Sequence, residues 1–412
     1  MSLRPLLILG TRPEAIKMAP VISECRQRAS MEPIACFTGQ HREMLRQVTD
    51  YFEIAPDVEL HVMSPGQSLA KLTSRLLTEL DEVVEKHRPN CLVAQGDTTS
   101  VLAASMVAFY RNLPLVHVEA GLRTGNLQSP FPEEFNRRVA GLIATLHAAP
   151  TARSASALAA ENIPASQIRV TGNTVIDALL YTRERERSRQ AHWQAKYEFL
   201  QNRPFILVTT HRRENHGRGL AEVFSALAAI AANHPDLAIL FPVHLNPQVQ
   251  AAAKELLGNR PNIYLVEPAP YPEFVWLMDN CHFMVTDSGG VQEEAPSLKR
   301  PVLVVRDTTE RQESVECGAV KLVGSHRGPL LAAAEELLAN PAAYQSMQVS
   351  TNPYGDGHAA KKIVDWMVEA IPPCRNSHDF LQSEFDDARK WRLVTSSTSR
   401  FSGFLTALSA IA

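Results

Sequence analysis

The chain has 412 residues, of which 45% are hydrophobic, and its formal net charge is -3. A single hydrophobic core rarely grows beyond ~250 to 300 residues, so this length predicts two domains. The small negative charge excludes a general attraction for nucleic acid or anionic lipid, and any anion site must be built locally from a few side chains.

The cysteines and the amino terminus indicate the compartment. Six cysteines are scattered without a CxxC pair, which is typical of reduced thiols in a cytoplasmic protein. The opening segment MSLRPLLILG has too short an apolar stretch for a signal peptide, and no run reaches the ~18 apolar residues that a membrane span needs. We therefore expect a cytoplasmic protein that neither enters a membrane nor binds nucleic acid.

Short apolar runs alternate with longer amphipathic stretches, the pattern of β-α units that feed a parallel sheet. In the first half the expected strands are LLIL, PIACFT, NCLVAQ and PLVHVE. After a charged, helix-favouring stretch at 181–196, which could bridge two domains, the pattern restarts with PFILVTT, LAILFPV, NIYLVE, HFMVT and PVLVV. We predict an α/β protein with two Rossmann-like, doubly wound domains that face a central cleft, where the carboxyl ends of the strands bind ligand.

The predicted limits follow from these patterns. The first domain spans 1–174 and the second spans 175–355. Residues 356–373 form a helix that packs back on the first domain. From 374 to 412 serine and threonine cluster and the periodicity fades, which predicts an atypical tail that is either disordered or ends in a short amphipathic helix at FSGFLTALSAIA.

The segment VTDSGGVQEEAPS lies between a predicted strand and a predicted helix in the second half. The backbone N–H groups of Ser288, Gly289 and Gly290 could bind a pyrophosphate there, whereas the alternative is an ordinary β-α turn with glycines. Glu293 and Glu294 follow in the first helical turn, where a carboxylate can accept hydrogen bonds from ribose hydroxyls. A nucleoside diphosphate fits both features.

Charged residues also follow the strands of the first half. Arg12 and Lys17 belong to GTRPEAIKMAP and either face the cleft or lie on a solvated surface. Asp97, Glu119 and Glu133 lie at or near strand ends. Burying such acids is costly unless they are paired or functional, and burial shifts their pKa toward values useful for proton transfer. For Asp97 the alternative is an N-cap of the next helix.

In the second half, His211 and Arg212 follow the strand FILVT, and His244 has a similar place one strand later. A lone histidine is more often structural, but a histidine followed by two arginines at a strand end favours anion contact or acid-base chemistry. The sequence has no GxGxxG motif after a strand, no P-loop, no HExxH and no closely spaced His or Cys ligand set. We therefore expect neither a cofactor nor a bound metal.

Many motifs together give the chain a specific resemblance. They are GTRPEAIKMAP, TGQHREML, QGDTTS, HVEAGLRTG, PFPEEFNRR, TGNTVIDAL, HRREN, PVHLNP, FVWLM, TDSGGVQEEAP, RDTTERQE and NPYGDG. In this order, over about residues 3 to 370, the chain resembles the non-hydrolysing UDP-N-acetylglucosamine 2-epimerase family. The resemblance implies a glycosyltransferase-B-like fold, usually a homodimer, with UDP held mainly by the second domain.

The resemblance also assigns residues by matching position. The catalytic set comprises Lys17, Asp97, Glu119, Glu133 and His211. The set that binds UDP and the sugar comprises Arg12, His211, Ser288, Gly289, Gly290, Glu294 and Arg311. A second, activating site for UDP-N-acetylglucosamine comprises Gln40, His41, Met44, Arg212 and His244.

The implied reaction is reversible epimerisation at C2 to UDP-N-acetylmannosamine, which supplies amino sugars for cell-surface polysaccharide. The C2 proton is not next to a carbonyl, and oxidation of a neighbouring hydroxyl would need a nicotinamide. Elimination of UDP to 2-acetamidoglucal, followed by re-addition, is therefore the economical route, with a carboxylate among Asp97, Glu119 and Glu133 removing the proton. The alternatives are a UDP-sugar-dependent glycosyltransferase of the same fold, a hydrolysing epimerase and a nucleotide-sugar sensor.

Overall fold

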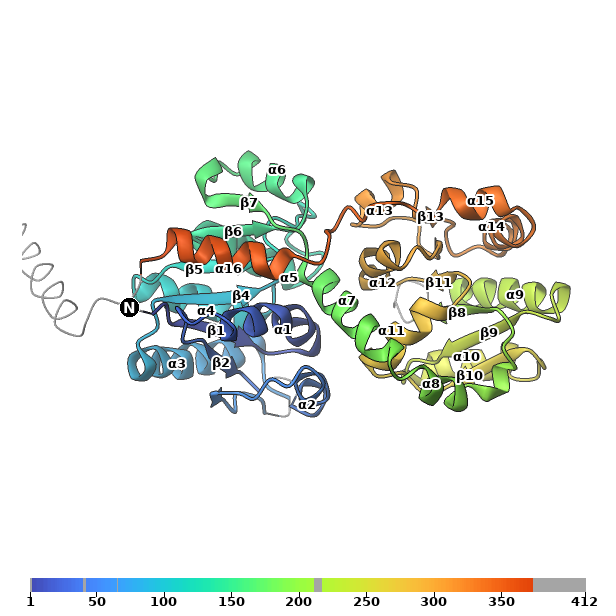
Figure 1. Cartoon of the computed structure of the whole chain (residues 1–412), viewed down its shortest axis with the longest axis horizontal. Coiled ribbons are helices and arrows are strands. Elements are labelled where there is room, and N and C mark those ends of the chain that lie inside the picture. Colours follow the sequence, from blue (N-terminus) through green and yellow to red (C-terminus); the bar gives the residue numbers. More distant parts are fainter. Residues whose placement is uncertain (1, 40–41, 65, 211–216, 373–412) are drawn as a thin grey trace, which may run out of the picture.

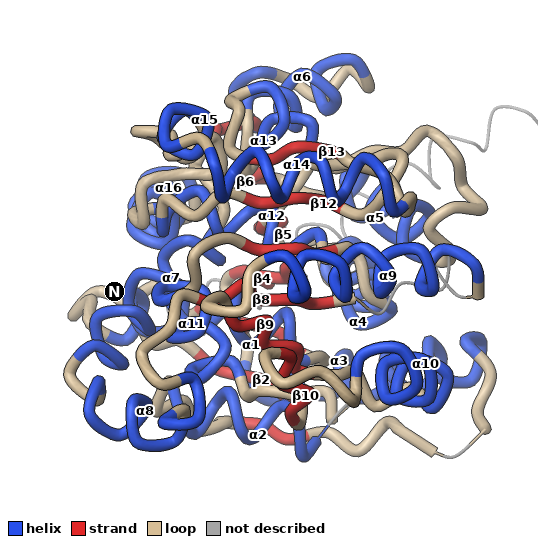
Figure 2. The backbone as a smooth tube through the Cα atoms, turned by 90° about the vertical axis from the view of Figure 1, so that its right-hand side faces the viewer, coloured by secondary structure: helices blue, strands red, loops and turns tan. Residues whose placement is uncertain are grey.

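The computed structural model describes residues 2–39, 42–64, 66–210 and 217–372, so the predicted tail from 374 lies outside the described residues. Its strands form two parallel sheets, one in each domain, with helices on both sides of each strand layer (Figures 1 and 2). No helix in the described part of the chain is long and apolar enough to cross a membrane.

The first domain contains a sheet of seven strands in the order β3-β2-β1-β4-β5-β6-β7. Its strands are β1 (Pro5–Leu9), β2 (Ile34–Phe37), β3 (Val58–Glu59), β4 (Cys91–Gln95), β5 (Leu115–Val118), β6 (Leu146–Ala149) and β7 (Ile168–Val170). Its helices are α1 (Arg12–Arg26), α2 (Arg42–Tyr51), α3 (Leu69–His87), α4 (Thr99–Tyr110), α5 (Glu133–Ile143) and α6 (Ala152–Ala160).

The second domain contains a sheet of six strands in the order β10-β9-β8-β11-β12-β13. Its strands are β8 (Phe205–Thr209), β9 (Ala238–Pro242), β10 (Ile263–Val266), β11 (Met284–Thr286), β12 (Val302–Val304) and β13 (Val320–Leu322). Its helices are α8 (Gln190–Lys196), α9 (Arg218–Asn233), α10 (Pro247–Leu257), α11 (Tyr271–Asn280), α12 (Gly289–Glu294), α13 (Gln312–Glu316), α14 (Arg327–Ala339) and α15 (Pro341–Ser346).

Strand β1 shows why the strands have continuous apolar runs. Leu6 and Ile8 pack into the core on one face of the sheet, whereas Leu7 and Leu9 pack into the core on the other face. A parallel strand covered by helices on both faces has no solvent-facing side, so its sequence does not alternate. Each of the nine predicted strands is confirmed, while β3, β6, β7 and β13 were not predicted.

The chain connects the domains through helix α7 (Thr174–Arg187) and through the segment that leads into helix α16 (Ala359–Ala370). Helix α7 packs against α1 of the first domain and α11 of the second, and it contains the start of the charged stretch at 181–196 (Figure 1). Helix α16 follows the second domain in the chain but lies against α1, where Arg28 Nη2 is 2.6 Å from Asp365 Oδ1. The chain therefore crosses between the domains twice.

Candidate active site

Glu119 lies directly after β5 and adopts a backbone conformation that is rare for a residue with a side chain. Its φ is 63°. This left-handed conformation is unfavourable outside glycine and persists only where the surrounding structure imposes it, which happens most often at functional sites. The side chain is 5% exposed. The fold thus uses a strained, buried residue to place this carboxylate.

Both oxygens of the Glu119 carboxylate accept hydrogen bonds. Lys17 Nζ lies 2.6 Å from Glu119 Oε1 and 2.7 Å from Oε2, and the amides of Gln95 and Asn173 also donate to it. Burial would raise the pKa of Glu119, but the charges of Lys17 and Arg311 and the hydrogen bonds from Lys17 and Asn173 lower it below its ordinary value. Lys17 keeps a raised pKa despite its own burial. Both groups are therefore ionised at neutral pH.

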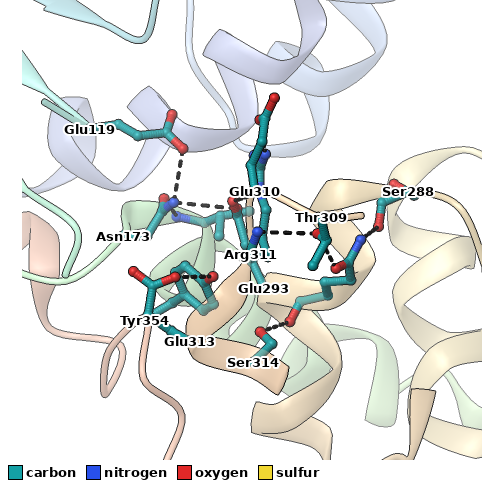
Figure 3. Close-up of polar contacts among 12 residues, drawn as sticks. Glu119, Asn173, Ser288, Glu293, Thr309, Glu310, Arg311, Glu313, Ser314 and Tyr354 are labelled. Atoms are coloured by element: carbon teal, nitrogen blue, oxygen red, sulfur yellow. Dashed lines mark hydrogen bonds and ion pairs between the residues drawn. The ribbon is translucent and has the colours of Figure 1, made fainter. Parts of the chain in front are cut away.

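Glu119 also meets the second domain. Asn173 Nδ2 lies 3.0 Å from Glu119 Oε1 and 3.3 Å from Glu293 Oε2, which belongs to α12 (Figure 3). Lys17 Nζ is 4.0 Å from the same Glu293 oxygen. Arg311 Nε donates to Glu293 Oε1 over 2.9 Å. Two carboxylates from different domains are thus brought together and neutralised by two cations.

Asp97 follows β4 and is held within the first domain. Arg137 Nη2 of α5 lies 2.5 Å from Asp97 Oδ2. Burial raises the pKa of Asp97 although Arg137 opposes the shift. The alternative interpretation of Asp97 as an N-cap is wrong, because Thr98 is the N-cap of α4 and its side chain accepts from the Val101 N–H.

Glu133 is the first residue of α5 and is partly exposed. Its carboxylate makes no hydrogen bond or ion pair with any residue that the structure describes. Its neighbour Glu134 is the buried one and accepts from the N–H groups of Thr124 and Gly125 over 3.0 and 3.2 Å. The structure therefore does not join Glu133 to Glu119 or Asp97 by any of these contacts, and its catalytic role stays a prediction.

The turn after β11 carries the predicted nucleotide residues. Ser288 is the N-cap of α12, and Gly289 and Gly290 are the first two residues of that helix. A Cβ on Gly289 would lie 3.1 Å from Arg311 Cζ, so glycine allows the guanidinium to lie against the turn. This places Arg311 beside both the turn and Glu293.

Glu294 lies at the other end of α12. It accepts a hydrogen bond from the Tyr271 hydroxyl over 2.9 Å, and burial raises its pKa to about 8. Burial lowers the pKa of Arg12, which belongs to the first domain, and its electrostatic interactions with Tyr271 and Glu294 oppose that shift. Arg12 is thus the second cation, with Lys17, that extends from α1 toward the second domain.

Comparisons with known proteins fit this geometry. A family model described as UDP-N-acetylglucosamine 2-epimerase matches residues 23–368. The UDP-N-acetylglucosamine 2-epimerase of Escherichia coli K12 is 47% identical over 367 residues, which cover 88% of this chain and 98% of that protein. A probable UDP-N-acetylglucosamine 2-epimerase of Ralstonia nicotianae is 50% identical and covers 87% of this chain and 96% of that protein.

This chain belongs to the UDP-N-acetylglucosamine 2-epimerase family.

Solved structures of family members share the fold. The Neisseria meningitidis enzyme bound to UDP-GlcNAc has a TM-score of 0.83 and 44% identity, and the match covers 89% of this chain and all of that chain. The Methanocaldococcus jannaschii enzyme, in complex with UDP-GlcNAc and UDP, has a TM-score of 0.74 and 32% identity with the same coverage. The predicted fold class, two Rossmann-like domains in a glycosyltransferase-B-like arrangement, is confirmed.

Most residues of the predicted activating site, and His211 of the predicted catalytic set, lie outside the described residues. Gln40, His41, His211 and Arg212 lie outside the described residues, and so does the side chain of Met44. His244 is exposed after β9, and its Nδ1 accepts from the Asn246 N–H over 3.1 Å. The predicted activating site is therefore represented in the structure by a single side chain.

Three residues that bond to the carboxylate of Glu119 or Asp97 were not predicted from the sequence, namely Gln95, Arg137 and Asn173. Each lies in or beside a segment that carried the resemblance: Gln95 in QGDTTS, Arg137 in PFPEEFNRR and Asn173 in TGNTVIDAL. Amides and a helical arginine have common structural roles, so only their contacts single them out. Among the described residues, no cluster of three or more His, Cys, Asp or Glu side chains is placed to hold a metal ion.

Proposed function

We propose that this epimerase interconverts UDP-N-acetylglucosamine and UDP-N-acetylmannosamine by eliminating UDP and adding it back. The observation that carries the proposal is a pair of carboxylates whose pKa values are displaced in opposite directions. The pKa of Glu119 is lowered and that of Asp97 is raised, although both follow adjacent parallel strands. Such a divergence assigns one proton acceptor and one proton donor.

In the elimination step, the Glu119 carboxylate accepts the proton from C2 of the sugar. The electron pair of the C2–H bond forms a C1=C2 double bond, and the C1–O bond to UDP breaks with its electrons going to UDP. The products are 2-acetamidoglucal, UDP and protonated Glu119. The ion pair with Lys17 stabilises the Glu119 carboxylate and so makes it a weak base. We therefore expect substrate binding to weaken this ion pair before the proton is transferred.

In the addition step, a UDP oxygen attacks C1 while Asp97 delivers a proton to C2 from the opposite face. The configuration at C2 is then inverted, Asp97 is a carboxylate and UDP is again bonded to C1. In the reverse direction Asp97 is the acceptor and Glu119 the donor. Exchange of protons with solvent restores the starting state between turnovers.

The departing UDP carries developing negative charge that must be stabilised in place. Arg311 beside Gly289, the N–H groups of Gly289 and Gly290 and Arg12 are the groups we propose for the pyrophosphate, whereas the Ser288 N–H already donates to Thr286 Oγ1 over 2.9 Å. Glu294 is proposed for the ribose hydroxyls. Since Arg12 and Lys17 come from the first domain, closure of the domains on the substrate would complete this set and keep the glycal from escaping.

The test is proton NMR of the purified protein with UDP-N-acetylglucosamine alone in heavy water. We expect UDP-N-acetylmannosamine to appear with deuterium at C2. Release of free N-acetylmannosamine would instead show hydrolysis. An unchanged substrate would contradict the proposal and favour a transferase that needs an acceptor, or a sensor.

We also propose a homodimer in the cytoplasm, with a second UDP-sugar site that activates the enzyme. Support for the dimer comes from exposed apolar side chains on neighbouring helices of the first domain, with Phe109 67%, Tyr110 68% and Leu142 82% exposed. The free cysteines Cys25, Cys36, Cys91, Cys281 and Cys317 suit a reducing compartment. Light scattering with Leu142→Glu tests the dimer: loss of mass supports this interface, and an unchanged dimer contradicts it.

A further inference from the structure

The two chain crossings between the domains meet at the active site. The first crossing runs through Gly172 and Asn173, and the second through Tyr354 and Gly355. Asn173 N–H donates to Tyr354 O over 2.7 Å, and a Cβ on Gly172 would lie 3.2 Å from the same oxygen. With φ at 89° Gly172 has the conformation that favours glycine. The crossings therefore fix the position of Asn173 closely.

Asn173 uses every polar atom of its side chain. Its Oδ1 accepts from the Val175 N–H over 3.0 Å and so caps the start of α7. Its Nδ2 has two hydrogens, and one carboxylate from each domain lies within reach: Glu119 at 3.0 Å and Glu293 at 3.3 Å. The residue is only 2% exposed, so these contacts are shielded from water.

Glu293 is itself tied to the second crossing. Asn352 Nδ2 donates to the Glu293 carbonyl over 2.7 Å, and Asn352 Oδ1 accepts from the Tyr354 N–H over 2.9 Å. These bonds tie α12 to the second crossing, so any motion of the second domain that separates Glu293 from Asn173 must also strain or break them. The amide of Asn173 is the point where the orientation of Glu119 and the position of the second domain become linked.

We infer that Asn173 is a positioning residue that orients Glu119 for proton transfer only when the second domain presents Glu293 to the same amide. The inference rests on the proposed function, because Glu119 matters only if it exchanges a proton with the sugar. It adds a link between domain position and the proton acceptor. Opening of the cleft would release Glu293 from the amide and loosen Glu119 at the same time.

Mutations can separate the role of Asn173 as the N-cap of α7 from its hydrogen bonds to Glu119 and Glu293. Asn173→Ser keeps an N-cap oxygen for α7 but is too short to bridge the two carboxylates. Asn173→Asp keeps the cap and the shape but loses both donors and adds a third negative charge. Asn340→Ser is a matched control, since Asn340 caps the exposed helix α15 far along the chain.

We expect Asn173→Ser to lower kcat by about 10- to 100-fold with KM changed by less than about threefold, because a misplaced base slows chemistry more than binding. Asn173→Asp should lower kcat further. Asn340→Ser should keep kcat within about twofold. Asn173→Ser and Asn340→Ser should melt close to the parent protein, since each retains a capping side chain, whereas Asn173→Asp should melt lower because its buried charge lies between two carboxylates.

The pH profile supplies a readout that a purely structural role would not change. Loss of one hydrogen bond to the ionised Glu119 should move the acid limb of kcat to higher pH by roughly 0.5 to 1 unit in Asn173→Ser, and further in Asn173→Asp. Lys17, Asp97, His117 and Arg311 interact electrostatically with Glu119, Glu293 shares the Asn173 amide with it, and all five remain in place.

Two failures are distinguishable. No turnover by the parent protein defeats the proposed function, and the inference falls with it. Turnover by the parent with an unchanged kcat and acid limb in Asn173→Ser defeats the inference alone. A lower kcat accompanied by a lower melting temperature and an unmoved acid limb also defeats it, because the residue would then act only as a helix cap.

Discussion

The two proposed proton-transfer carboxylates are held in different ways. Asp97 depends on Arg137, which lies on α5 of its own domain, so its setting is complete within the first domain. Glu119 is held by Lys17, Gln95 and Asn173, and through Asn173 and Lys17 it meets Glu293 of the second domain. One acid is therefore fixed by the fold of a domain, whereas the other depends on how the two domains are placed.

This difference matters because the mechanism needs both acids at once. A carboxylate with a lowered pKa stays ionised and can accept a proton, and one with a raised pKa can hold a proton for delivery. If domain placement controls only Glu119, UDP can enter the site proposed for it in the second domain before the proton acceptor is in position. Four substitutions test how far the site depends on the fold of each domain and how far on the placement of the two domains.

The largest effect is expected from Glu119→Gln. The amide cannot accept the C2 proton, so kcat should fall by about 100- to 10,000-fold while KM changes little. The value of kcat is measured from the rate at which UDP-N-acetylglucosamine is converted, monitored by NMR. Glu82→Gln, on the exposed face of α3, is the matched control and should behave like the parent. Near-normal turnover by Glu119→Gln would remove this residue from the mechanism.

Asp97→Asn should reduce kcat by about 100- to 1,000-fold, because an amide cannot deliver the proton to C2. It should also destabilise the first domain by about 1 to 3 kcal/mol, because Arg137 loses a charged partner in a site where its side chain is only 7% exposed. Urea unfolding measures the stability, with exposed Asp236→Asn as the control. Full stability together with full activity would contradict the role of this ion pair.

Glu294→Gln tests a third acid, which lies wholly in the second domain. Its pKa is raised from an ordinary 4.5 to about 8, so the folded protein keeps the carboxyl protonated while the unfolded chain ionises. The resulting loss of stability is absent below pH 4.5, grows as pH rises and is complete above about pH 8.

The variant cannot ionise at this position. Its melting temperature relative to the parent should therefore rise between pH 5 and 8 and then level off. Exposed Glu255→Gln, on α10, should show no such trend. A constant difference across this range would contradict the raised pKa.

The smallest effect is expected at the outer contact between the domains. Arg153 Nη2 lies 2.5 Å from Glu316 Oε1, but the two side chains are 54% and 61% exposed. Exposed ion pairs contribute about 0 to 1 kcal/mol, so Arg153→Ala should shift melting by no more than about 2 °C and leave kcat within about twofold. A double-mutant cycle with Glu316→Ala isolates the pair. A large loss of kcat would show that this contact also controls domain placement.

The sequence predicted much of this architecture for a physical reason. Strands covered on both faces need continuous apolar runs, and PLLIL or FILVT can be recognised without knowing their neighbours. The strands that escaped prediction lack this signal. β6 reads LHAA, with small side chains, and β7 reads IRV and is partly exposed at the edge of its sheet. The polar residues after β4, β5 and β11 were recognised because ligands bind at the carboxyl ends of parallel strands.

The sequence by itself thus determined two parallel sheets, the acids at their strand ends and the glycine turn before α12. Only the tertiary structure decided which side chains meet: Asn173 contacts Glu119 from 54 residues away and Glu293 from 120 residues away. Local patterns report burial and chain direction within each sheet. They carry no information about the relative position of two sheets, and that position sets the distances between Lys17, Glu119, Asn173 and Glu293.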